Sequence, residues 1–321
     1  MTDRLTLSLK TRLRVSEKLM SEKKLKDLVV KMSDRGKKRS DIDPETLKIF
    51  EDMMLEDDAA SLEKPASTMP RSAEKRSEQD QLPLWPKATR GVPNAVLRSA
   101  LFGVVMKGRR RFCNELEVPS AGNLKIKFTG LRLDQADLDV WEQCLSLAKE
   151  NGLGTRIEFI ANHFLEAIGR SKGKSQHKWL KESLKRLNGA QVEIQEGDRA
   201  YFGTLIYEGF RDEGSGHYIV QLNPKLSRLY GQHNWTRVQW DQRHALKRDL
   251  SQWLHGFYSS HKAPFPIKTK TIHWLCGSEN ADMSGFRKNL KNALIELQTV
   301  TGWRCWIDRS DRVNIVRKAT A

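Results

Sequence analysis

A row of lysines is the first set of residues in this sequence whose types and spacing point to a chemistry. Lys174, Lys178, Lys181 and Lys185 recur at i, i+4, i+7 and i+11. At 100° per residue these four positions share one face of a helix. Ammonium groups in such a row attract a polyanion, and phosphates at the edge of a DNA groove fit the row as its ligand.

The start of the same helix carries residues that could contact bases. Ser175, Gln176 and His177 lie in its first turn, where a recognition helix presents its base-contacting groups. Arg170 and Lys172 add positive charge in the turn before it. The alternative is a solvated amphipathic helix whose lysines serve solubility. We prefer the DNA interpretation because of the net charge and the strands that follow.

A second segment, near the C-terminus, repeats this arrangement. Arg287, Lys288 and Lys291 take the place of the lysine row, and Asn289 and Asn292 could read bases. Asparagine pairs with adenine, and arginine with guanine, through two hydrogen bonds in the major groove. For contacts to the DNA backbone or the minor groove, we expect three arginines in the wings: Arg199, Arg309 and Arg312.

We find no pattern in the sequence that is typical of a catalytic or metal site. The eight histidines form no H-x-H or H-E-x-x-H pattern, and there is no G-x-x-x-x-G-K-[ST] phosphate loop. Asp137 and Asp139 are the nearest to a metal-binding pair, but a capped, solvated helix start explains them better. Tyr258 and His261 are expected to pack rather than to nick DNA. We therefore expect no enzyme activity, no metal and no cofactor.

The composition agrees with a nucleic-acid partner. The 321 residues carry a formal net charge of +16, and residues 1–80, with 18 basic and 17 acidic residues, contribute only +1 of it. No apolar stretch approaches the roughly 18 residues that a membrane span needs, and no signal peptide is apparent. The four cysteines are widely spaced, as in a reduced cytosolic protein. We expect a cytoplasmic protein without a membrane partner.

Three helices and several strands surround the lysine row. Asp134 can cap a first helix, and further helices are predicted at about 157–168 and 174–187. Alternating runs at 192–195, 201–207 and 218–222 then predict strands. This order is typical of a winged helix-turn-helix domain, in which a β-hairpin, the wing, follows the recognition helix.

The same order recurs after residue 240. Helices are predicted at about 242–261, 269–276 and 284–297, and strands at 303–307 and 313–316. The leucines at 180, 184 and 187 and those at 290, 294 and 297 share one spacing. Each set follows a helix that ends in an apolar pair and a glycine, at 167–169 and 275–277. We interpret this match as an internal duplication.

These patterns predict an α+β fold with two tandem winged-helix domains. We divide the chain into a charged helical region at 1–60, a flexible linker at 61–90, a first winged-helix domain at 91–223 and a second at 224–321. Within the first domain, regular structure is expected to resume near Leu124.

A short motif lies where the linker meets the folded part. Gln81, Leu82, Leu84 and Trp85 belong to a pentapeptide, QLPLW, that has the form of the Q-L-x-L-F peptide with which bacterial proteins bind the replicative sliding clamp. The alternative is a stretch that packs on the protein's own first domain.

Beyond single motifs, the chain resembles the TrfA-type replication initiators of broad-host-range plasmids. The resemblance covers about residues 80–317. It rests on segments that occur in family order: 81–85 (QLPLW), 98–102 (RSALF), 128–131 (FTGL), 141–145 (WEQCL), 258–261 (YSSH) and 275–278 (LCGS).

The resemblance implies a protein that binds direct repeats, called iterons, in a plasmid origin as a monomer. It further implies help in opening the adjacent duplex, recruitment of the host helicase, host initiator and sliding clamp, and a self-dimer with low initiation activity. The main alternative is a winged-helix transcriptional repressor that acts as a dimer. A nicking or recombination enzyme would need a tyrosine or histidine constellation that we do not find.

Overall fold

The structure is a computed structural model, and it describes residues 82–106, 108, 110–149, 156–197, 199–212, 214–231 and 234–317. The helices expected within residues 1–60 and the linker residues up to 81 lie outside this part of the chain. None of the described helices is both long and apolar enough to cross a membrane.

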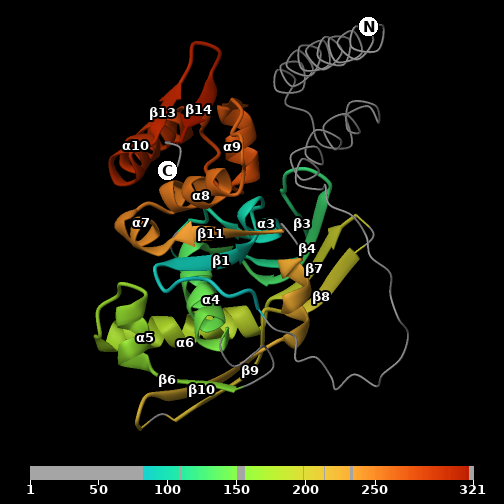
Figure 1. Cartoon of the computed structure of the whole chain (residues 1–321), viewed down its shortest axis with the longest axis vertical. Coiled ribbons are helices and arrows are strands. Elements are labelled where there is room, and N and C mark those ends of the chain that lie inside the picture. The colour runs from blue at the N-terminus through green and yellow to red at the C-terminus, as the bar shows by residue number, and fades with distance from the viewer. Residues whose placement is uncertain are drawn as a thin grey trace, which may run out of the picture. The chain divides into compact units, whose positions relative to one another are not determined.

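The first repeat, residues 135–222, combines three helices with a three-stranded sheet (Figure 1). Its first helix begins where predicted, because Asp134 and Asp137 form a reciprocal capping box. The sheet order is β6-β10-β9, and all its pairs are antiparallel. In chain order the elements are α4 (Gln135–Ala148), β6 (Arg156–Ile160), α5 (Ala161–Ala167), α6 (Lys174–Asn188), β9 (Ile206–Arg211) and β10 (His217–Leu222).

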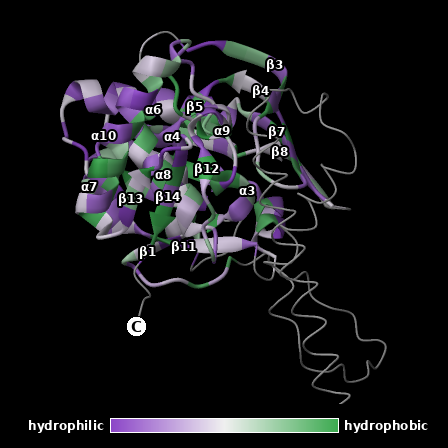
Figure 2. Ribbon diagram, turned by 90° about the horizontal axis from the view of Figure 1, so that it is seen from above, coloured by the Kyte–Doolittle hydropathy of each residue, from purple (hydrophilic) through white to green (hydrophobic). Residues whose placement is uncertain are grey.

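The second repeat, residues 249–316, has the same elements in the same order. Its sheet order, β12-β14-β13, also places the last strand between the first and the second. Figure 2 shows its helices alternating between hydrophobic and hydrophilic residues, as amphipathic helices do. In chain order the elements are α8 (Asp249–Ser259), β12 (Ile267–Lys268), α9 (Thr269–Leu275), α10 (Met283–Thr301), β13 (Arg304–Ile307) and β14 (Arg312–Val316).

The similarity between the two repeats extends to individual hydrogen bonds. Gly169 and Gly277 follow α5 and α9 with φ of 68° and 61°, and each begins the turn toward the third helix. The next backbone N–H in each repeat donates back to the helix, Arg170 to Leu165 (2.8 Å) and Ser278 to His273 (3.2 Å). Both helices therefore end in the same glycine-dependent motif.

Two predicted helices have different bounds in the structure. Residues 157–160 belong to strand β6, because Ile157 and Phe159 alternate with exposed residues and pair with β10. The predicted helix at 242–261 is two helices, α7 (Trp240–Ala245) and α8, since buried Leu246 after α7 has extended backbone angles. Both predicted helices were wrong where the backbone changes between helical and extended conformation, because the spacing of apolar residues does not reveal such a change.

The run at 201–207, predicted as one strand, contains parts of two. β8 (Arg199–Thr204) ends before a bend at buried Leu205, and β9 continues in a different sheet. β8 pairs with β7 (Gln191–Glu196) in a separate four-stranded antiparallel sheet of order β3-β4-β7-β8. Its other two strands are β3 (Phe112–Val118) and β4 (Leu124–Leu131) (Figure 1). The β7–β8 hairpin is thus an insertion between α6 and β9 that the second repeat lacks.

Regular structure begins well before Leu124, contrary to the prediction. β1 (Thr89–Pro93) pairs antiparallel with β11 (Trp235–Gln239), and β2 (Phe102–Gly103) pairs in parallel with β5 (Leu133–Asp134). Between β1 and β2 lies the short helix α3 (Asn94–Leu97). These partners lie far away in the sequence, so the segment has little local periodicity of its own.

Residues 82–106 contact both repeats and hold them together. Toward the first repeat, the Arg90 guanidinium donates to the Gln143 amide oxygen of α4 (2.8 Å). Toward the second, the Trp253 indole N–H of α8 donates to the Ser99 carbonyl (3.0 Å), and the Val104 N–H donates to the Cys276 carbonyl (2.8 Å). A buried ion pair joins α4 of the first repeat to α7, which precedes the second repeat, because Arg243 donates to Asp139 (Nε–Oδ1 2.6 Å). Another short element, the 3-10 helix η2 (Pro224–Tyr230), precedes β11.

Candidate nucleic-acid interface

Helix α6 presents the predicted lysine row on a face beside its core contacts, about one residue round the helix from the leucines. Leu180, Leu184 and Leu187 are buried, as the sequence predicts. On the lysine face Lys174, Lys178 and Lys185 are exposed, whereas Lys181 is half-buried. Among the described residues, neither Lys174 nor Lys178 has an ion-pair partner, so both ammonium groups can meet a phosphate.

Several predicted contact residues of the first repeat are already bound within the protein. The guanidinium of Arg170 donates to the Gln176 amide oxygen (2.9 Å) and lies 3.5 Å from the centre of the Trp179 ring. The Lys172 ammonium lies 2.9 Å from the Glu166 carboxylate, and the Lys185 ammonium lies 3.8 Å from that of Glu182. These side chains fix the start of α6 and the turn before it.

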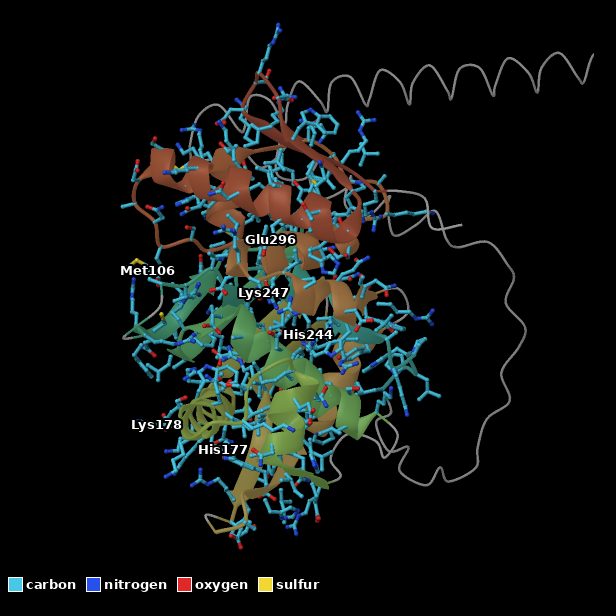
Figure 3. The ribbon with its side chains drawn as sticks, turned by 90° about the vertical axis from the view of Figure 1, so that its left-hand side faces the viewer. Met106, His177, Lys178, His244, Lys247 and Glu296 are labelled. Atoms are coloured by element: carbon cyan, nitrogen blue, oxygen red, sulfur yellow. The ribbon has the colours of Figure 1, made fainter. Side chains whose placement is uncertain are left out.

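A cavity of about 410 Å³ opens at the start of α6, against the β9–β10 hairpin. We call it the basic pocket. Figure 3 labels two of its residues, His177 and Lys178, on the same helix. The His177 Nε2 lies 2.7 Å from the Asn162 amide oxygen, which holds the imidazole against α5. The lining residues are Asn162, Lys172, Lys174, His177, Lys178, Arg211, Gly216 and Tyr218.

Sequence reasoning missed Arg211 and Asn162 in this pocket. Arg211 lies at the end of β9, whose existence as a separate strand the sequence did not reveal. Its guanidinium donates to the Tyr218 hydroxyl (3.3 Å), which holds it at the pocket wall. Asn162 lies on the first turn of α5, where the predicted helix bounds were wrong.

In the second repeat, α10 exposes four of its predicted contact residues, Lys288, Asn289, Lys291 and Asn292. The fifth, Arg287, donates two hydrogen bonds to Asp311 in the turn between β13 and β14 (Nε–Oδ1 3.1 Å, Nη2–Oδ2 2.8 Å). This pairing raises the pKa of Arg287 and lowers that of Asp311. Arg287 therefore fixes α10 to the β13–β14 hairpin instead of standing free to read guanine.

The predicted wing arginines have different locations. Arg309 is exposed in the turn of the β13–β14 hairpin, and Arg312 is half-buried at the start of β14, so both belong to the hairpin that follows α10. Arg199 begins β8 in the four-stranded sheet. Contrary to the prediction, Arg199 lies outside the hairpin that packs beside α6, which is β9–β10.

The acidic pair at the start of α4 is structural. Asp137 is buried and accepts hydrogen bonds from Ser183 (2.6 Å) and Arg186 (2.7 Å), and burial raises its pKa. The predicted cap is present, but the start of the helix is not solvated as we expected. Within the described residues, no three His, Cys, Asp or Glu side chains form a group that could hold a metal ion.

The clamp-like peptide packs on the folded part of the protein. Leu82 and Trp85 are buried, whereas Leu84 is 72% exposed, and Gln81 lies outside the described residues. The Trp85 ring stacks on Tyr230, and the Lys149 ammonium donates to the Trp85 carbonyl (3.1 Å). The peptide thus packs on the protein itself, as the alternative interpretation predicts, but on Tyr230 of the predicted second domain as well as on Lys149 of the predicted first.

Comparisons with known proteins bear on the whole chain. The profile of the family described as "TrfA protein" matches residues 73–314. The chain is 26% identical, over 223 residues, to the plasmid replication initiator protein TrfA of Escherichia coli. That match covers 67% of this chain but only 58% of the relative, so this chain spans less than two thirds of it.

Two solved structures are similar to this chain at low sequence identity. Domains 2 and 3 of RctB superimpose with a TM-score of 0.50 and 11% identity, over 70% of this chain and 97% of theirs. The Pi initiator protein, solved in complex with iteron DNA, superimposes with a TM-score of 0.44 and 13% identity, over 57% of this chain and 94% of that one. The likeness to RctB concerns the fold alone.

Proposed function

Because this chain belongs to the TrfA protein family, we propose that it is a plasmid replication initiator that binds direct repeats in origin DNA. The observation that carries the proposal is the exposure, in each of two repeats, of a basic third helix beside a β-hairpin. A helix placed in this way can enter the major groove while the hairpin contacts the backbone or the minor groove.

In this proposal each repeat acts as a winged-helix module. The order helix, strand, helix, helix, strand, strand and the sheet order support that assignment. Two modules in one chain supply the two contacts that a repressor obtains by pairing two chains. A monomer can therefore occupy one direct repeat and cover about two helical turns of the duplex, with strongly salt-dependent affinity.

Recruitment of the helicase, the host initiator and the sliding clamp, and formation of a self-dimer, belong to the proposal on the strength of the family resemblance. The packing of the pentapeptide adds a condition to clamp binding. Since Leu82 and Trp85 are buried, the peptide must leave the protein's own core before both apolar groups can enter another protein. We propose that the protein works in the bacterial cytoplasm by binding, without catalysis of its own.

Footprinting on the DNA beside the gene tests the proposed function. We expect regularly spaced protection of direct repeats, and a protein-to-repeat ratio of one in mass measurements of the complex. Protection of a single inverted repeat by two chains would instead identify a dimeric repressor. Absence of any sequence-dependent protection would refute the initiator proposal.

A further inference from the structure

The two repeats differ in charge at the contact between the third helix and the hairpin that follows it. Gly216 and Asp311 occupy equivalent positions there. Each is the last residue of the hairpin turn, with φ of 67° and 58°. Each carbonyl accepts the first N–H of the second helix, from Ala161 (3.0 Å) and from Thr269 (2.9 Å). A side chain at this position of the second repeat therefore indicates what the same position of the first repeat could hold.

In the second repeat this position holds a carboxylate. Asp311 accepts hydrogen bonds from Arg287 (2.8 Å) and from the Thr269 hydroxyl (2.5 Å), so the α9–α10–wing junction is neutralised from within. A second carboxylate, that of Asp282, accepts the backbone N–H groups of Ser284 (2.9 Å) and Gly285 (2.7 Å) at the start of α10. Two anionic groups thus belong to the fold of this repeat.

The first repeat has no carboxylate at either position. Gly216 replaces Asp311, and Gly173 at the N-cap of α6 supplies no side-chain hydrogen bond. A Cβ atom on Gly216 would meet only the Ala161 Cβ, 4.0 Å away, so the space is open. It forms part of the basic pocket, where none of the described lining residues is acidic. Lys174, Lys178 and Arg211 supply positive charge there, beside Lys172, whose ammonium is paired with Glu166.

We infer that the basic pocket binds one backbone phosphate of the DNA, at the position that the Asp311 carboxylate occupies in the second repeat. The inference rests on the proposed function for its choice of DNA as the source of the phosphate. The N–H groups at the start of α6 and the lysine and arginine side chains are the donors that such an anion needs. The first repeat then anchors the backbone, while the second carries its own anion and relies more on base contacts.

Gly216→Asp tests the inference by placing a carboxylate where the phosphate would bind. The variant is expected to fold, because Asp311 already adopts nearly the same φ and because the space is open. Gly216→Asn is the matched control with the same size and backbone demand but no charge. We expect three- to tenfold weaker duplex binding for Gly216→Asp than for Gly216→Asn. The slope of log K against log salt should be smaller by about 0.9, as for one lost phosphate contact.

A second measurement separates this inference from the proposed function. Inorganic phosphate, compared with chloride at equal ionic strength, should raise the melting temperature of the wild type and of Gly216→Asn more than that of Gly216→Asp, whose shift gives the general effect of phosphate as an excluded salt. Equal salt slopes for the two variants would overturn the inference. They would do so even if inorganic phosphate stabilises the protein, because the pocket would then bind a free ion and not the DNA backbone. If the wild type binds no duplex, the proposed function fails, and the phosphate titration still decides whether the pocket is an anion site.

Discussion

Two asparagines and one lysine, on the third helices of the two repeats, are expected to make different contributions to DNA binding. Lys178 is an exposed ammonium without an ion-pair partner among the described residues, and it lines a pocket with other cations. Asn289 and Asn292 are exposed on α10 beside the lysines of that helix. The lysine ammonium attracts the phosphates of any duplex, whereas an asparagine amide that makes two hydrogen bonds to adenine distinguishes adenine from the other bases.

We predict that Lys178→Ala weakens binding to specific and random duplexes alike and lowers the salt slope by about 0.9.

Asn289→Ala should weaken binding to the specific repeat alone, by about 1–3 kcal/mol if two hydrogen bonds to adenine are lost. Competition gel shifts at several salt concentrations measure both. Lys127→Ala, on β4 in the four-stranded sheet, serves as the control and should change neither quantity. Equal losses on both duplexes for Asn289→Ala would contradict its assignment.

Glu142 is a buried acid whose carboxylate oxygens have no hydrogen-bond partner among the described residues. Burial raises its pKa to about 7, although Arg243, 3.9 Å away, opposes that effect. Asp139 raises the pKa further, and Arg90 lowers it. Because the unfolded chain ionises at the usual value of 4.5, the folded state binds the proton more tightly.

The sign of the pH dependence follows from this shift. Below about pH 4.5 the acid is neutral in both states, and above about pH 7 its ionisation destabilises the folded state in full. We predict that the free energy of unfolding of the wild type, relative to that of Glu142→Gln, falls by about 2 kcal/mol between pH 5 and pH 7.5. Urea unfolding of both proteins at the two pH values measures this difference. Parallel curves would show that Glu142 does not titrate in this range.

At the scale of elements, the third helices were the most predictable part of the fold. Their leucines repeat with the helical period and face the core, so α6 and α10 lie where the sequence places them. The glycines that end α5 and α9 were equally informative, because a left-handed residue after a helix has a local cause.

Elements that depend on distant partners were not predictable in this way. β1 becomes a strand by pairing with β11, some 145 residues later. β8 belongs to the four-stranded sheet and not to the sheet beside α6, because its partner β7 pairs with β4. The prediction of the site was incomplete for the same reason, since Arg211 lines the basic pocket only because β9 is a separate strand. Likewise, the pairing of Arg287 with Asp311 depends on the fold of the wing, which spacing alone does not give.

The packing of the clamp-like peptide depends on a glycine in β1, Gly91, which leaves room for the Trp85 ring. A Cβ atom on Gly91 would lie 2.4 Å from the Trp85 ring, closer than any real contact. We predict that Gly91→Ala displaces Trp85, lowers the melting temperature and increases binding to the purified sliding clamp. Surface plasmon resonance on the immobilised clamp measures the last effect.

Leu84→Ala provides the matched comparison, because Leu84 is exposed and contributes little to the core. It should leave the melting temperature unchanged and cut clamp binding in either background. If neither substitution changes binding to the clamp, the pentapeptide is a packing element only.

For the whole molecule, the contact between the repeats decides how DNA is bound. Arg243 of α7, just before the second repeat, is fully buried and donates to Asp139 and to both the side chain and the carbonyl of Gln135. The Lys247 N–H after α7 donates to Glu296 of α10 (2.7 Å), which joins this segment to the third helix of the second repeat. Residues 82–106 add hydrogen bonds to α8 and to the end of α9. Breaking a buried charge pair from one side costs about 3–5 kcal/mol, so α4 and α7 are held in one arrangement. The two third helices should therefore keep a fixed spacing on the duplex.

A series of binding sites with inserted base pairs tests that fixed spacing. With the repeats held in one arrangement, 5 inserted base pairs rotate the second half-site by roughly half a turn, and 10 restore its face but move it by about 34 Å. We predict that both insertions lower the affinity for the duplex at least tenfold, to the affinity expected when only one of the protein's two third helices contacts its half-site. A flexible connection would instead recover affinity at 10 base pairs. Gel shifts across the series measure the effect, and recovery at 10 would show that the buried contacts of Arg243 do not fix the two modules when DNA is bound.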